Sequence, residues 1–209
     1  MRAKLTINSR AFSKQAKASL AKNNKAVIEK NLKLNTGELV SSKIEKMKKE
    51  MISEFLNLPI TREIMGGPTA SNSSGTLGGY GNLFSFIGFD SGSNPIDPIV
   101  RLLDQTTYNF SNLSPRGVMK LTITLPSAKD IFGVTPLPWA PGISWAQRME
   151  VGLSGLGQYL DKHSDKSRSG AGLQSKNKIR SGTFRNTPYI STFIKRWSKK
   201  FLRIEKSLI

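Results

Sequence analysis

The most prominent feature of the sequence is the uneven placement of charge along the chain. The protein carries 32 Lys and Arg against 14 Asp and Glu, a net charge of +18. Residues 1–50 hold a net +9 and residues 146–209 a net +10, whereas residues 51–145 hold −1. Two basic ends therefore flank a neutral, Gly- and Pro-rich middle. Such a field attracts polyanions or acidic protein surfaces, and by itself it does not specify a fold.

The supply of apolar residues sets the size of the core. At 209 residues, one domain with mobile arms is the natural expectation. Hydrophobic residues make up 37% of the chain, below the roughly 45–50% that is usual when Gly is counted too. The core therefore does not use every segment. We expect residues 1–10 to be a poorly ordered or partner-docked arm, and residues 11–209 to be a single domain.

Apolar periodicity predicts an α+β fold. Three- and four-residue steps indicate two long N-terminal helices, from about residue 12 to 32 and from 37 to 58, separated by a break at 35–37. Strands are predicted at 83–89 and 118–125, giving a small, mostly antiparallel sheet. Shorter helices are predicted at 61–65, 97–106 and 144–153, and extended loops at about 66–82, 126–142 and 161–186.

The chain ends in a predicted amphipathic helix that begins at Thr187-Pro188, an N-cap residue followed by Pro. One face is apolar and the opposite face is basic. Packing of the apolar face in the core is the expected role, and binding to a membrane surface is the alternative. The apolar face comprises Tyr189, Ile190, Phe193, Ile194, Trp197 and Phe201.

Catalytic and metal-binding patterns are absent from the sequence. The one histidine, His163, lies in a polar segment, and there is no cysteine, so the usual zinc ligand set cannot form. The Gly-rich stretch at 66–81 matches neither of the common phosphate-binding motifs. We expect a protein that is not an enzyme and that uses no cofactor and no metal.

The longest apolar runs fall well short of the roughly 20 residues that a membrane span requires. The basic N-terminus also lacks the apolar stretch of a secretion signal. We therefore expect no membrane association and no export by the usual route.

The basic segment at 161–186 is the sharpest candidate for partner contacts. Lysine and arginine alternate there with small residues, and aromatic side chains are sparse. Contact with nucleic-acid phosphates, contact with acidic proteins and a merely solvated loop are all open interpretations. The residues expected to contact a partner are Arg168, Lys176, Lys178, Arg180 and Arg185.

Several stretches together resemble small virion proteins of tailed bacteriophages. The stretch at 182–190 is similar to the step into the C-terminal helix of phage neck and tail-completion proteins, and helix-rich N-termini before a small sheet also fit that group. The stretches that carry the likeness are Ile64–Pro68 followed by Gly75–Phe89, Ser167–Gln174 and Gly182–Ile190.

The resemblance implies a structural virion protein that forms a homo-oligomeric ring at the neck or tail end, in tail completion or head-tail connection. It implies assembly in the host cytoplasm, and partners among neighbouring neck and tail proteins or packaged DNA. Arms that order only on assembly would suit the low apolar content. The alternative, from charge alone, is a nucleic-acid-binding protein that uses its basic N- and C-terminal regions.

Overall fold

The protein has an α+β fold, as predicted, and its chain divides into two compact units. The structure, a computed structural model, describes residues 3–9, 25–77, 82–111, 119–151, 160–161, 173–174 and 188–204. Unit 1 comprises Met1–Ser53, Leu102–Ser127 and Ile194–Ile209; unit 2 comprises Glu54–Arg101 and Ala128–Phe193. Folding of residues 11–209 as a single domain stays a prediction.

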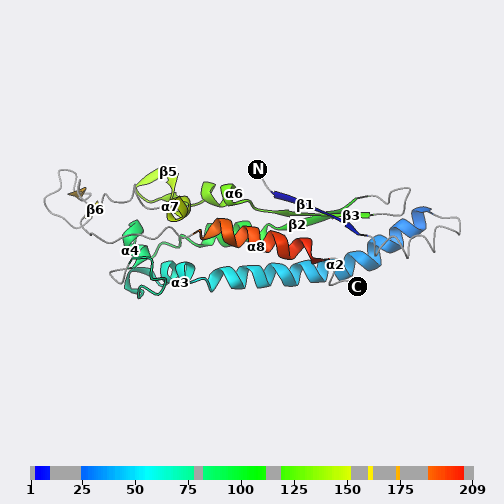
Figure 1. The fold of residues 1–209 in the computed structure, drawn as a ribbon, viewed down its shortest axis with the longest axis horizontal. Helices are drawn as coiled ribbons and strands as arrows, with labels where there is room; N and C mark the ends of the chain where they lie inside the picture. Colours follow the sequence, from blue (N-terminus) through cyan, green and yellow to red (C-terminus); the bar gives the residue numbers. More distant parts are fainter. Residues whose placement is uncertain are drawn as a thin grey trace. The chain divides into compact units, whose positions relative to one another are not determined.

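Unit 1 contains a three-stranded antiparallel sheet (Figure 1). Its central strand, β3 (Met119–Leu125), lies between β1 (Ala3–Ser9) and β2 (Thr107–Phe110). Along β3 the side chains of Leu121, Ile123 and Leu125 are buried, whereas the two intervening threonines are half-buried. This alternation is what places one face of a strand against a core, so the prediction of a strand at 118–125 is confirmed.

The N-terminal segment is part of this sheet, which corrects the expectation of an arm at residues 1–10. β1 pairs with β3 over its full length, from Ala3 opposite Leu125 to Ser9 opposite Met119. The local sequence gave no sign of this because the partner strand lies more than 100 residues away along the chain. Strand β2 was also not foreseen, and it pairs with β3 from Thr107 opposite Thr124 to Phe110 opposite Leu121.

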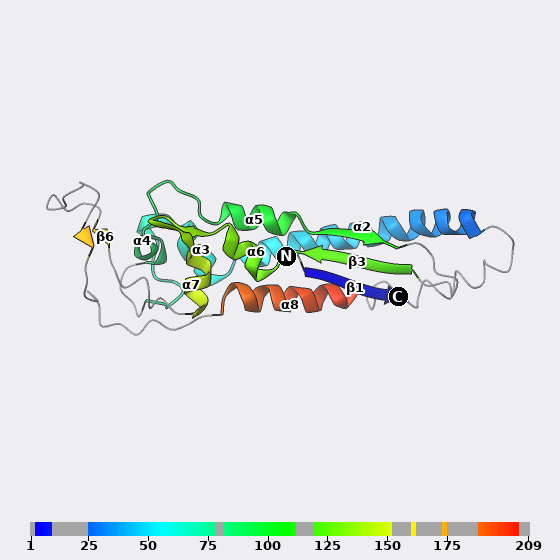
Figure 2. The same cartoon turned by 90° about the horizontal axis from the view of Figure 1, so that it is seen from above.

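The long helix α2 (Lys25–Leu56) is continuous where the sequence predicts a break. It runs through residues 35–37, and a Cβ added at Gly37 would meet nothing within 4 Å. A single glycine costs a helix about 1 kcal/mol, which packing of the following turns readily exceeds. The buried residues of those turns are Val40, Ile44, Met47, Met51 and Phe55. Figures 1 and 2 show the sheet over α2, with α8 (Ile190–Leu202) alongside.

Unit 2 begins with short helices around a glycine-rich loop. These are α3 (Pro59–Met65), the 3₁₀ helix η1 (Gly67–Thr69), α4 (Leu83–Ile87) and the start of α5 (Asp97–Asp104). The predicted helices at 61–65 and 97–106 are confirmed, but the predicted strand at 83–89 is wrong. The Asn82 side chain caps that segment as a helix, and Gly88, at φ +88°, ends it.

The proline-rich passage expected as a loop at 126–142 is instead largely folded. It contains α6 (Ala128–Gly133), and β4 (Pro136–Leu137) pairs with β5 (Ala140–Ser144). The predicted helix that follows is confirmed as α7 (Trp145–Val151), with its first turn held by the Ser144 hydroxyl, which accepts from Gln147 N–H at 3.0 Å. Farther on, β6 (Leu160–Asp161) pairs with β7 (Leu173–Gln174).

Candidate functional site

The five partner-contact residues expected from sequence lie outside the described residues. They are Arg168, Lys176, Lys178, Arg180 and Arg185. His163 also lies outside them. The described residues hold 18 of the 32 Lys and Arg and 12 of the 14 Asp and Glu, a net +6. The described residues therefore carry one third of the net charge of the chain.

Within the described residues, lysine and arginine concentrate on one face of α8. On a helix of 3.6 residues per turn, the basic positions from 195 to 203 fall within an arc of about 140°. All of their side chains are exposed. Arg203 directly follows the helix, and its N–H donates to the Lys200 carbonyl at 3.1 Å, which continues the turn. We call this set the cationic face of α8: Lys195, Arg196, Lys199, Lys200 and Arg203.

Residues 188–204 contain neither Asp nor Glu, and Glu205 is the first acidic residue after the cationic face. Lys200 places its Nζ 4.0 Å from the centre of the Trp197 ring, so a cation–π contact orients this side chain. Lys199 and Lys200 also occupy the last helical turn, where positive charge is favoured by the helix dipole. The cation–π contact and the helix dipole thus offset part of the repulsion among these like charges.

The opposite end of α8 is held by an acid from another helix. The Glu150 carboxylate of α7 accepts a hydrogen bond from the Ser191 backbone N–H at 2.5 Å and a second from the Ser191 hydroxyl. A carboxylate at a helix N-terminus satisfies a free N–H donor and complements the dipole. The helix that carries the cationic face is therefore fixed at its start by a specific contact within unit 2.

The apolar face of α8 is buried, as predicted. Tyr189, Ile190, Phe193, Ile194, Trp197 and Phe201 are each no more than 7% exposed. Trp197 and Phe201 pack with ring centroids 5.9 Å apart. The alternative of a membrane-surface helix requires this face to enter lipid. That face is instead occupied by the protein's own side chains.

No helix in the described part of the chain is both long and apolar enough to cross a bilayer.

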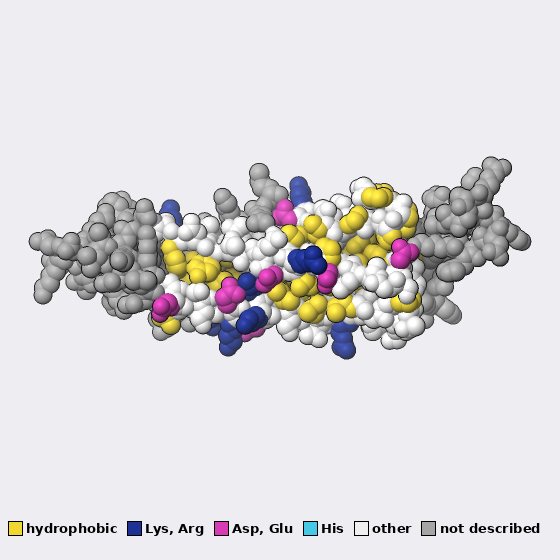
Figure 3. Space-filling model, turned by 180° about the vertical axis from the view of Figure 1, so that it is seen from behind, with side chains coloured by type: hydrophobic (Ala, Val, Ile, Leu, Met, Phe, Trp, Pro, Cys, Tyr) yellow, Lys and Arg dark blue, Asp and Glu magenta, His cyan; other side chains and the backbone are white. Residues whose placement is uncertain are grey.

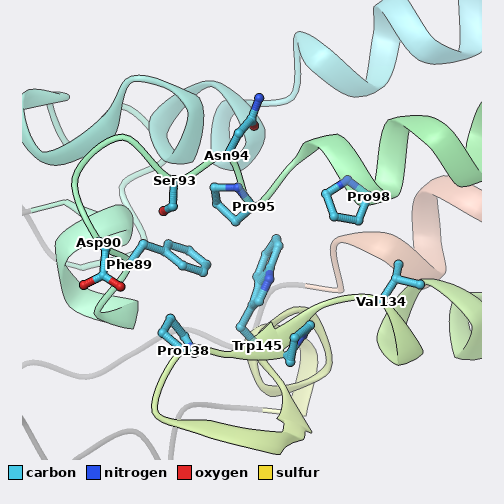
Figure 4. Close-up of a pocket in the computed structure, with 10 residues that line it drawn as sticks. Phe89, Asp90, Ser93, Asn94, Pro95, Pro98, Val134, Pro138 and Trp145 are labelled. Atoms are coloured by element: carbon cyan, nitrogen blue, oxygen red, sulfur yellow. The ribbon is translucent and has the colours of Figure 1, made fainter.

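A second feature is an apolar pocket of about 240 Å³ in unit 2 (Figure 4). Trp145 stands against it, and the Phe89 and Trp145 rings meet edge to face with centroids 5.7 Å apart. Asp90, Ser93 and Asn94 supply the polar groups among the described lining residues. Proline rings and Val134 form much of the remaining wall, so the pocket suits a small apolar group better than an ion. The lining prolines are Pro95, Pro98, Pro136 and Pro138.

A buried carboxylate organises the glycine-rich loop beside α3. Glu63 is 1% exposed, and its Oε2 accepts from Ser74 N–H at 2.9 Å while its Oε1 accepts from Leu83 N–H at 2.8 Å. Asn82 also donates from its side chain to the Pro68 carbonyl at 2.7 Å. Two backbone donors stabilise a carboxylate that burial would otherwise disfavour. Sequence analysis missed Glu63 because nothing in the local pattern shows that it points inward.

On the face of the molecule that Figure 3 shows, positive and negative side chains are intermixed. In Figure 3, lysine and arginine side chains stand among aspartate and glutamate side chains rather than gathering in a patch. Recorded ion pairs follow the same pattern: Lys48 Nζ lies 3.0 Å from Glu45 and 3.4 Å from Asp104. Within the described ranges, no group of three or more His, Cys, Asp or Glu is placed to hold a metal. The cationic face of α8 is therefore the strongest candidate site.

Comparison with protein-family models, curated proteins and solved structures finds no match to this chain.

Proposed function

We propose that this protein is a structural component of a tailed-phage particle, forming a homo-oligomeric ring at the neck or tail end. The proposal rests on the resemblance carried by Ile64–Pro68, Gly75–Phe89, Ser167–Gln174 and Gly182–Ile190. Its partners would be copies of itself and neighbouring neck or tail proteins, in a virion assembled in the host cytoplasm.

The single observation that best supports this role is the segregation of charge. Residues 1–50 hold a net +9 and residues 146–209 a net +10, whereas residues 51–145 hold −1. An excess of like charge repels itself, and acidic surfaces or polyanions relieve that repulsion. A near-neutral middle between two strongly basic ends suits a subunit whose surroundings in an assembly supply negative charge.

The two units add a second support. Each has its own buried side chains, but neither offers a paired acid and base in the pocket or at the cationic face. The described surface is instead made of helix faces, a sheet and an apolar pocket that suit contacts with other chains. Binding is the activity that this set of features can perform.

Oligomeric state and particle content test the proposal together. We expect light scattering of the purified chain, alone or mixed with its neighbouring virion proteins, to show a ring-sized species. We also expect protein analysis and imaging of particles to find the chain at the neck or tail end. A chain that stays monomeric in every mixture and is missing from particles would end the proposal.

The second candidate function is nucleic-acid binding outside any particle, and the cationic face of α8 favours it. Such a protein would bind DNA or RNA with strong salt dependence while being absent from virions. The particle analysis above separates the two candidates, because binding alone is compatible with both.

A further inference from the structure

We propose that the cationic face of α8 binds the phosphate backbone of duplex DNA, with Lys195, Lys199 and Arg203 as its main row of contacts. This inference goes beyond the ring assembly, and its test does not depend on oligomeric state. It also assigns a role to a surface that is distinct from the basic segment at 161–186 singled out by sequence.

The spacing of the row suits a polymer with regular negative charge. Positions four apart on a helix are separated by a rise of about 6 Å, so the row from 195 to 203 extends about 12 Å. One DNA strand presents a phosphate every 3.4 Å or so along the duplex axis, so three or four phosphates fall within that length. Arg196 and Lys200 lie on the adjoining strip of the same face, where they can meet the same backbone.

Lys195, Lys199 and Arg203 place three exposed positive charges along one row of the helix. Lysines on α2 alternate with glutamates, whereas residues 188–204 contain five cations and no carboxylate. Phosphate contacts gain from such a field because each neutralised phosphate releases condensed counterions. The two arginines add planar donors that fit phosphate oxygens in pairs.

The burial of aromatic rings points to duplex rather than single-stranded DNA. Proteins that hold single strands stack bases on exposed aromatic side chains. Near the cationic face, Tyr189, Phe193, Trp197 and Phe201 are at most 5% exposed, so none of them presents a ring for stacking. Contacts from this face are therefore made to the backbone, which positions a duplex without reading its sequence.

A charge-matched pair of triple variants of the full chain tests the proposal. The first combines Lys195→Gln, Lys199→Gln and Arg203→Gln on the cationic face of α8. The control combines Lys46→Gln, Lys49→Gln and Lys129→Gln, three exposed lysines elsewhere. Both remove three positive charges, and glutamine is a good helix former. Thermal unfolding verifies that both variants remain folded.

Affinity is measured by fluorescence anisotropy with a duplex of about 25 base pairs and mixed sequence, between about 50 and 200 mM salt. We expect the α8 triple to bind on the order of 100-fold more weakly at about 100 mM salt. Its slope of log affinity against log salt should fall by about 3, close to one for each lost phosphate contact. The control triple should keep nearly the wild-type slope.

Four outcomes would overturn the proposal. These are no duplex binding by the wild-type chain, equal losses in both triples, an unchanged salt slope in the α8 triple, and tighter binding to a single strand of the same length. Binding to poly-glutamate but not to DNA would assign the face to an acidic protein instead. Light scattering of the same samples reports ring formation separately, so failure of one proposal is distinguishable from failure of the other.

Discussion

Helices α2 and α8 are both rich in lysine, but α2 also contains acidic residues and α8 contains none. Between Lys25 and Leu56, α2 carries seven basic and five acidic residues, and Lys48 is paired with Glu45 on the same helix and with Asp104. From position 188 to 204 the chain carries five basic residues and none that is acidic. Both helices nevertheless bury a row of large apolar side chains.

The difference shows that burial and charge compensation are separate properties of a helix. Burial of an apolar stripe fixes where each helix sits, and both helices have that stripe. The balance of positive and negative charge on the exposed face decides how strongly that face attracts oppositely charged molecules. On α2, Lys48 lies close enough to Glu45 and Asp104 to interact with both, whereas α8 carries no acidic residue of its own. Substitutions at four positions test this contrast, in order of decreasing expected effect.

The largest expected effect is on the buried side of α8. Trp197 is 1% exposed, so Trp197→Ala should lower the free energy of unfolding by about 3–5 kcal/mol, through lost burial and a cavity. Lys199→Gln, on the exposed side of the same helix, should change it by less than about 0.5 kcal/mol. Chemical denaturation of both variants measures the difference. Similar effects from the two substitutions would mean that α8 does not pack as described.

The next largest effect on stability is expected at Tyr189, which lies just before α8. The Tyr189 ring stacks on Phe55 of α2 at a centroid distance of 6.0 Å. Its hydroxyl hydrogen-bonds the Thr61 hydroxyl at 2.6 Å. Tyr189→Phe should cost about 1–3 kcal/mol, because the buried Thr61 hydroxyl loses its partner. Denaturation at neutral pH measures this cost.

Tyr189 should also make the free energy of unfolding depend on pH. Burial raises the pKa of the Tyr189 phenol, although the bond from Thr61 opposes this. Tyr189 contributes its full stabilisation below a pH of about 10, which is the pKa of tyrosine in the unfolded chain. As the pH rises above this value, only the phenol of the unfolded chain ionises, so the free energy of unfolding falls. Stability of Tyr189→Phe should fall less steeply above about pH 10 than that of Thr61→Val, which retains the phenol. Parallel slopes would contradict this assignment.

A smaller gain is expected in the middle of α2. Gly37→Ala should raise the free energy of unfolding by about 0.5–1 kcal/mol, because alanine is the better helix former and its Cβ has open space. Gly75→Ala provides the opposite case: Gly75 has φ +65°, so alanine there should be destabilising. Thermal unfolding with circular dichroism measures both. A loss at position 37 would restore the break predicted from sequence.

The smallest effect tests charge compensation on α2 itself. Burial lowers the pKa of Lys48, but its hydrogen bonds and attraction to Glu45 and Asp104 outweigh this and raise it overall. Lys48→Gln should therefore cost less than about 1 kcal/mol near neutral pH. The cost should shrink above about pH 10.5, because the amine of the unfolded chain then loses its proton before the amine of the folded chain does. Lys49→Gln, an exposed neighbour, serves as the control, and an equal cost there would remove any role for the pair.

Local signals in the sequence account for much of the fold. The four-residue steps from Phe193 to Trp197 and from Trp197 to Phe201 predicted both the helix and its buried face. For α4 the local signals were also present: Asn82 as N-cap and Gly88 as C-cap bracket the segment. Apolar and aromatic composition favoured a strand there, and the caps show why a helix formed instead.

The candidate site was only partly foreseen. The basic side of the final helix was visible from sequence, but the residues expected to contact a partner lie at 168–185, outside the described residues. The burial of the helix's aromatic rings, which decides between stacking and backbone contact, was predicted from sequence and is confirmed by the structure. Glu63 and its two backbone donors appeared only in the structure, because they join positions 63, 74 and 83.

Apolar periodicity was enough to predict the α+β class, the central strand β3 and the two faces of α8, because it follows directly from the geometry of each element. Three features could be seen only in the folded chain: Ala3–Ser9 pairs with β3, α2 continues past Gly37, and Glu63 is buried. Each of these depends on groups distant in the chain, whose contacts outweigh the local preference of the residues involved.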